Sequence, residues 1–186
     1  MKVKAVLLVA FAFVAMNVNG QDLKFGAKGG LNFANMGKDA NTDMRVGFHV
    51  GGFAQYGINE SFMLQPEVLI SLEGAKADMG TSTENLNLTW LNIPIMGVYK
   101  IGAVQGLSLE AGPQLGFLMS AKYDGHDIKD GYKSVNISLN LGAGYAVNEQ
   151  IGVGLRYCIG LSDLNDTGFN SEVSQNNFQL SVAYKF

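Results

Sequence analysis

The sequence is poor in three kinds of residue that mark common protein classes. It has a single cysteine, Cys158, so it forms neither an internal disulfide nor a thiolate metal cage. Charged residues make up only 16% of the chain, against about 25% in soluble domains. There are three prolines, and the 24 glycines follow no three-residue period, which excludes collagen and proline-rich linkers. A net charge of −3 excludes the basic surplus of nucleic-acid-binding proteins.

The first twenty residues have the pattern of a secretory signal. Lys2 and Lys4 precede the apolar run Ala5–Met16, and small or polar residues lead to Gly20. The run is too short to span a bilayer and has no amphipathic stripe. We therefore predict a signal peptide over residues 1–20 and one exported domain over residues 21–186. Loss of the two lysines leaves 11 basic against 16 acidic side chains, a net charge of −5.

Beyond residue 20, apolar and polar residues alternate, as in β-strands with two unlike faces. No later apolar run reaches the ~18 residues of a transmembrane helix. Eight strands are predicted near Leu23–Met36, Met44–Gly57, Phe62–Ala75, Leu86–Ile101, Leu107–Lys122, Val135–Val147, Ile151–Ser162 and Asn177–Phe186. Within Leu86–Ile101 the alternation slips around Trp90, which predicts a β-bulge there.

The connections between these strands alternate in length. Short turns are expected at Ile58–Ser61, Gly102–Gly106 and Asn148–Gln150. Longer polar loops are expected at Gly37–Asp43, Lys76–Asn85, Asp124–Lys133 and Asp163–Gln175. This arrangement predicts an up-and-down meander, which an even number of strands can close into a barrel. Irregular pairing is expected at Pro66, Pro94 and Pro113, because proline lacks the amide hydrogen that a ladder needs.

Alternation alone does not tell whether the apolar face points into a core or into lipid. A soluble, lipocalin-like barrel would carry charges outside, whereas the polar positions here are mostly Gly, Asn, Ser and Gln, which suit a narrow lumen. Aromatic residues gather near both strand ends, as the two interfaces of a bilayer favour. One belt is predicted from Phe25, Tyr56, Phe62, Tyr99, Tyr145, Tyr184 and Phe186, and the other from Phe33, Phe48, Trp90, Phe117 and Phe178. We therefore predict an all-β fold, an eight-stranded antiparallel up-and-down transmembrane β-barrel, with the soluble barrel as the alternative.

Several short segments resemble those of a known family. They are Leu64-Gln-Pro-Glu67, Leu91-Asn-Ile-Pro94, Glu110-Ala-Gly-Pro113, Gly154-Leu-Arg-Tyr157 and the terminal Tyr184-Lys-Phe186. Together they resemble the PorT-type small outer-membrane β-barrels of Gram-negative bacteria, over essentially all of residues 21–186. The resemblance implies an outer-membrane location. It also implies that Phe186, Tyr184 and Val182 form the C-terminal signal read by the barrel-assembly machinery.

Four charged side chains on the polar face are predicted to meet inside the barrel. Counted from the short turns, Glu67, Glu110 and Arg156 lie at similar heights on their strands, with Lys28 nearby. A buried charge is costly unless it is paired, and the planar guanidinium group matches carboxylates. The pattern favours a network that plugs the lumen, and a proton or ion path is the alternative.

Little in the sequence points to catalysis. Only His49 and His126 could act as a base at neutral pH, and no base is placed beside Cys158. The aspartates around His126 lack the spacing of an EF-hand, and no phosphate-binding loop or nucleophile elbow is present. We therefore predict no enzyme activity, no metal site and no cofactor.

The predicted function is a structural, envelope or surface-interaction role with a side-chain-filled lumen. The alternatives are a narrow solute or ion channel, a membrane-embedded enzyme acting on lipid, and an accessory of a protein-secretion system, the last implied by the resemblance alone. The expected partners are outer-membrane lipids, the barrel-assembly machinery during biogenesis and a surface ligand bound by the long loops. No nucleic acid is expected.

Overall fold

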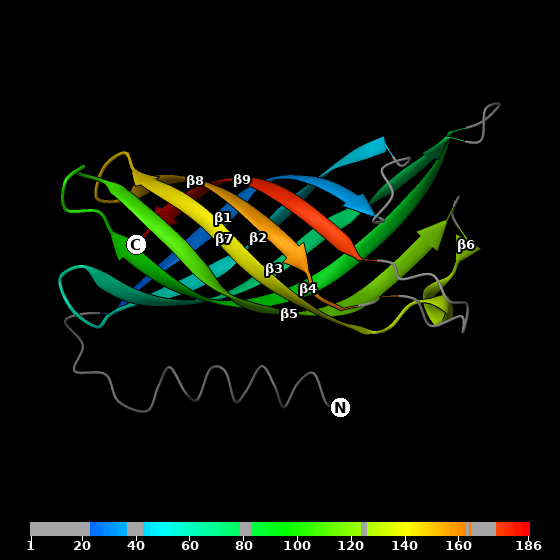
Figure 1. Cartoon of the computed structure of the whole chain (residues 1–186), viewed down its shortest axis with the longest axis horizontal. Helices are drawn as coiled ribbons and strands as arrows, with labels where there is room; N and C mark the ends of the chain where they lie inside the picture. The colour runs from blue at the N-terminus through cyan, green and yellow to red at the C-terminus, as the bar shows by residue number, and fades with distance from the viewer. Residues whose placement is uncertain (1–22, 37–42, 79–82, 124–125, 163, 165–173) are drawn as a thin grey trace.

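The computed structural model is a closed antiparallel β-barrel (Figure 1). It describes residues 23–36, 43–78, 83–123, 126–162, 164 and 174–186. The wall consists of β1 (Leu23–Met36), β2 (Asp43–Gly57), β3 (Phe62–Asp78), β4 (Thr83–Lys100), β5 (Leu107–Tyr123), β7 (Val135–Ala146), β8 (Ile151–Gly160) and β9 (Gln175–Lys185). Each strand pairs with its neighbours along the chain, and β1 pairs with β9 to complete the ring. The predicted eight-stranded up-and-down barrel is confirmed.

Two neighbouring strands run further into a long loop than the alternation predicts, whereas β8 ends two residues earlier. β3 and β4 extend to Asp78 and Thr83, so their hairpin takes up much of the predicted loop Lys76–Asn85. A two-residue strand, β6 (His126–Asp127), and a short 3-10 helix, η1 (Lys129–Gly131), occupy a segment predicted to be irregular. Among the described residues, no helix has the length and apolarity to cross a membrane. The predicted signal peptide lies outside the described residues.

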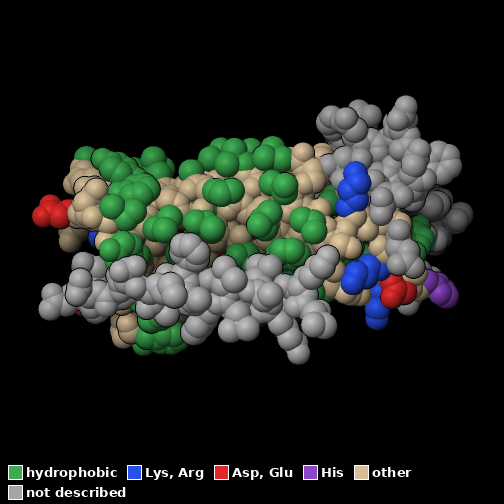
Figure 2. All heavy atoms as spheres, turned by 90° about the horizontal axis from the view of Figure 1, so that it is seen from below, with side chains coloured by type: hydrophobic (Ala, Val, Ile, Leu, Met, Phe, Trp, Pro, Cys, Tyr) green, Lys and Arg blue, Asp and Glu red, His purple; other side chains and the backbone are tan. Residues whose placement is uncertain are grey.

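The apolar face of the wall points outward and the polar face points into the lumen. In β8, for example, Leu155 is 48% exposed whereas the adjacent Arg156 is 4% exposed. Hydrophobic side chains cover the middle of the wall, and charged side chains lie at its two ends on the face shown in Figure 2. The buried polar side chains include Asn32, His49, Ser71, Asn92, Asn140, Asn177 and Gln179. An apolar exterior around a polar interior is the arrangement of a barrel immersed in lipid.

Trp90 is the exception to the predicted aromatic belts. It lies inside the barrel, only 1% exposed, and the alternation in β4 is unbroken from Leu88 to Val98. The irregularity is on the neighbouring strand: Thr89 pairs with Ser120 and Trp90 with Leu118, which leaves Met119 as an extra residue of β5. A bulge is therefore present beside Trp90, but its extra residue belongs to β5, so the prediction of a bulge within Leu86–Ile101 was wrong about which strand carries it. Leu88 and Trp90 are apolar and face inward, so at this end of β4 the apolar positions do not mark the outer face.

Each of the three prolines lies at a break in one ladder. Pro66 interrupts the β2–β3 pairing, Pro94 the β3–β4 pairing and Pro113 the β4–β5 pairing. In the register, Pro66 and Pro94 are offset by one residue, and so are Pro94 and Pro113. The breaks therefore form one row across three neighbouring strands, and the predicted irregularity at these positions is confirmed.

The inward-facing Gly51 allows β2 and β3 to approach closely. A Cβ atom at Gly51 would lie 1.9 Å from the carbonyl oxygen of Val68, whereas one at the outward-facing Gly52 would have its first neighbour at 3.5 Å. We expect Gly51→Ala to destabilise the barrel by roughly 1–3 kcal/mol, because backbone must move. Gly52→Ala is the matched control and should have little effect. Urea unfolding of both variants in detergent checks this, and equal midpoints would contradict the close approach.

Candidate functional site: a charged network across the lumen

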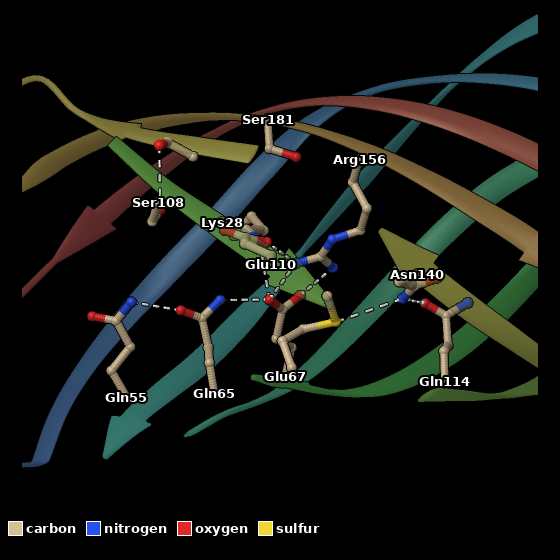
Figure 3. Close-up of polar contacts among 12 residues, drawn as sticks. Lys28, Gln55, Gln65, Glu67, Ser108, Glu110, Gln114, Asn140, Arg156 and Ser181 are labelled. Carbon is tan, nitrogen blue, oxygen red and sulfur yellow. Dashed lines mark hydrogen bonds and ion pairs between the residues drawn. The ribbon is translucent and has the colours of Figure 1, made fainter. Parts of the chain in front are cut away.

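Arg156 reaches across the lumen from β8 to the opposite wall (Figure 3). Its Nη1 atom donates to Oε2 of Glu67 at 2.9 Å, and Nη2 donates to Oε1 at 2.8 Å. Glu67 belongs to β3, which is four places from β8 in the ring of eight strands. Nη2 also donates to Oε2 of Glu110 on β5 at 2.8 Å. One guanidinium group thus ties three separate strands together.

Lys28 on β1 completes the network. Its Nζ atom lies 2.9 Å from Oε1 of Glu67, and Gln65 donates to the same oxygen at 2.6 Å. Two cations therefore face two carboxylates, which leaves the network neutral. Three of its members are buried, with Glu67 1%, Arg156 4% and Lys28 8% exposed, and the fourth, Glu110, is partly buried. Burying ions costs several kcal/mol each, and only close pairing with further hydrogen bonds offsets this.

These are the four charged side chains of the predicted network, in which Glu67, Glu110 and Arg156 were expected at similar heights with Lys28 nearby. The structure brings Lys28, Glu67, Glu110 and Arg156 into direct contact. Sequence reasoning did not include Gln65, which has the same strand parity as Glu67 two residues earlier. Parity is the signal that could have added it, because i and i+2 share a face of a strand.

A second, mainly uncharged cluster adjoins the network. His49 Nδ1 lies 2.8 Å from Asn32 Oδ1, and His49 Nε2 lies 2.9 Å from Ser181 Oγ. Asn32 in turn donates to Ser71 at 2.7 Å, and Ser71 donates to the Glu73 carboxylate at 2.6 Å. Glu73 also accepts hydrogen bonds from Asn92 and Gln175. The residues of this cluster come from β1, β2, β3, β4 and β9. The cluster therefore cannot be predicted without the register in which these strands pair.

An apolar cluster fills the lumen toward the long loops. Its buried members are Leu88, Trp90, Leu118, Ala121 and Leu164, and Tyr123, Ile128 and Tyr132 pack against it. Burial raises the pKa of the Tyr132 phenol above its usual range. The lumen is therefore occupied at two levels, by paired charges nearer the short turns and by apolar side chains nearer the long loops.

The remaining predicted aromatic residues lie on the outer wall. Phe48 and Phe178 are exposed toward the long loops, and Tyr56, Tyr99 and Tyr145 are exposed toward the short turns. The three residues of the predicted C-terminal signal, Val182, Tyr184 and Phe186, also face outward. The rings of Tyr184 and Phe186 pack edge to face, with centroids 5.8 Å apart. Trp90 alone of the belt residues singled out lies inside.

A closed ring of eight antiparallel strands, with apolar side chains outside and polar ones inside, defines the class of outer-membrane β-barrels. The chain belongs to the outer membrane protein beta-barrel domain family, whose model matches residues 5–186. It is therefore an integral outer-membrane protein, and the soluble, lipocalin-like alternative is wrong. No curated protein matches the sequence.

Two solved structures show the same fold. Neisserial surface protein A is 18% identical, with 88% of this chain and 97% of that chain covered and a TM-score of 0.56. The attachment invasion locus protein Ail of Yersinia pestis, in a phospholipid nanodisc, is 14% identical, with 88% and 99% covered and a TM-score of 0.55. At these identities the likeness concerns the fold alone.

Proposed function

We propose that this protein is a structural barrel whose lumen is closed to solutes and whose long loops make its outer contacts. The observation that supports this most directly is the Arg156 guanidinium, which bonds to Glu67 on the opposite wall and to Glu110. An eight-stranded barrel has a lumen that side chains alone can fill. The apolar cluster around Trp90 adds a second layer of side chains.

Ion flux through reconstituted barrels tests the closed lumen. Proteoliposomes loaded with potassium should leak no faster than empty liposomes, because charged and apolar side chains fill the lumen at two heights. Insertion is checked separately by the anomalous migration of the unboiled protein on SDS gels, which reports a closed barrel. Discrete conductance steps from protein that passes this check would contradict the structural role and favour a narrow channel.

We also propose that the chain is a PorT-type barrel within its family. This proposal is supported by the positions, in the barrel, of the segments that carry the resemblance. Glu67, Glu110 and Arg156 come from three of those segments, and Arg156 donates hydrogen bonds to both carboxylates. Pro66, Pro94 and Pro113 come from the same group of segments and interrupt neighbouring ladders. A shared position in the fold gives a physical reason for these segments to occur together.

A non-catalytic role and two kinds of partner complete the proposal. Both ring nitrogens of His49 are engaged by Asn32 and Ser181, which argues against a free general base. The outward apolar side chains are suited to contact outer-membrane lipids. Val182, Tyr184 and Phe186 are exposed on the outer wall, as recognition by the barrel-assembly machinery requires.

A further inference from the structure

A cavity of about 830 Å³ opens among the short turns, below the charged network. We call it the short-turn vestibule. Its charged lining residues are Lys24, Lys28, Lys100, Lys185, Glu110 and Glu149. Two of them, Lys28 and Glu110, are paired with the buried Glu67 and Arg156. The neutral network therefore closes the inner end of the vestibule, and the other four charged side chains determine the charge of its mouth.

Three lysines at the mouth lack a partner among the described residues. Lys24 on β1, Lys100 on β4 and Lys185 on β9 have the strand parity of the lumen face. No hydrogen bond or ion pair joins their ammonium groups to any other residue in the described part of the chain. Lys24 and Lys100 both lie close enough to Lys185 to repel it. Among the described lining residues, Glu149 is the one carboxylate without a cationic partner.

This positive mouth contrasts with the chain as a whole, which carries a net charge of −3. A concave site with a surplus of one sign of charge and low-dielectric walls concentrates the field and attracts counter-ions. Lysine ammonium groups act as mobile point charges that suit phosphate and carboxylate oxygens. The volume is within the range of about 300–1,000 Å³ found for small-molecule sites. Gln55, Gln65, Ser108 and Ser181 supply further polar groups on the lining.

We propose that the short-turn vestibule binds a small multivalent anion bearing phosphate or carboxylate groups. In barrels of this class the short turns face the periplasm, so the anion enters from that side. Lys24, Lys100 and Lys185 bind it, and its charge relieves their mutual repulsion. The anion binds on the periplasmic side of the charged network, which closes the inner end of the vestibule.

Calorimetric titration of the full barrel in a nonionic detergent at low ionic strength tests the proposal. Pyrophosphate and citrate are the probes, and chloride is the monovalent control. We expect saturable binding of one multivalent anion per barrel, with the tighter probe identifying phosphate or carboxylate as the preferred group. Each of Lys24→Gln, Lys100→Gln and Lys185→Gln should weaken binding about two- to fivefold, the range for a partly exposed ion pair. Lys122→Gln, at the long-loop end, is the charge-matched control and should leave binding unchanged.

Unfolding in urea separates binding from a structural role of the lysines. The triple variant with all three glutamines should be at least as stable as the parent without anion, because repulsion is removed. Pyrophosphate or citrate should raise the unfolding midpoint of the parent and leave that of the triple variant unchanged. Failure of both anions to bind saturably, or equal weakening by Lys122→Gln, would overturn the proposal. So would a triple variant that is less stable than the parent and still stabilised by the anion.

Discussion

Replacing Arg156 with alanine is expected to destabilise the barrel by about 3–5 kcal/mol, the usual loss when one partner of a buried ion pair is removed. Among the described residues, Arg156 is the only donor to Oε2 of Glu67 and the only partner of the Glu110 carboxylate. The variant would therefore keep a partly buried carboxylate, that of Glu110, without a cation. Urea unfolding in detergent measures the change through Trp90, the single tryptophan, which is buried in the folded barrel.

The Glu110 carboxylate should account for more of the lost stability than the Glu67 carboxylate. Glu67 keeps its ion pair with Lys28 and its hydrogen bond from Gln65, whereas Glu110 keeps neither kind of partner among the described residues. Arg156→Ala combined with Glu110→Gln should therefore recover more stability than Arg156→Ala combined with Glu67→Gln. Arg45→Ala, the removal of the only other arginine, is the control, and its smaller burial predicts a smaller loss.

Acidic pH should narrow the difference between Arg156→Ala and the parent. Protonation neutralises the carboxylate that the substitution leaves without a partner, and so removes its repulsion with Glu67. Urea unfolding of both proteins at neutral and at mildly acidic pH measures this difference in stability. If the variant matches the parent at both pH values, Arg156 is solvated, the lumen is wet, and a channel becomes the better proposal.

The wall of the barrel could be predicted because alternation is a local property of each strand. Leu155 and Arg156 illustrate this: neighbours in sequence necessarily point to opposite faces. The alternating lengths of turns and loops then predicted an up-and-down meander, and the even number of strands predicted that it closes into a barrel. The small, uncharged residues on the polar face indicated which side is inside. Each of these inferences needs only residues that are close together in the chain.

Trp90 shows where this reasoning stops. Alternation defines two faces, but it does not identify the inner one where both carry apolar residues, as at the long-loop end of β4. There Leu88 and Trp90 face Leu118 inside the lumen, and the extra residue Met119 shifts the partner strand. Such a cluster depends on contacts across the barrel and with Leu164, which is distant in sequence. No single strand contains that information.

The charged network lies between these two cases. Counting residues from the short turns was enough to place Glu67, Glu110 and Arg156 at one height, because short turns align the strand ends. It could not reveal that His49 bridges Asn32 and Ser181, since this requires the stagger between β1, β2 and β9. Lys24, Lys100 and Lys185 share the parity of the lumen face, but only the closed ring brings them around one cavity.

Replacing Leu155 with arginine is expected to cost about 2–4 kcal/mol, the depth-dependent penalty for a cation near the bilayer midplane. Leu155 lies near the middle of β8, is 48% exposed on the outer wall, and pairs with Ala143 and Leu180. Leu180 is itself exposed and apolar, so nothing beside the new guanidinium group would solvate it. Urea unfolding from lipid vesicles, followed by Trp90 emission, measures the loss in the environment that causes it.

Gly154→Ser is the matched control on the lumen face of the same strand. A Cβ atom at Gly154 would have its first neighbour, the carbonyl oxygen of Ala143, at 3.6 Å, and Gly154 lines the short-turn vestibule. The serine therefore has both space and polar surroundings, and its effect should be smaller than that of Leu155→Arg. The difference should shrink when Leu155→Arg is unfolded from small detergent micelles, where water lies closer to the wall. A tolerated arginine together with a damaging serine would mean that the apolar face of β8 packs against protein, and the barrel could not sit in lipid as its exterior indicates.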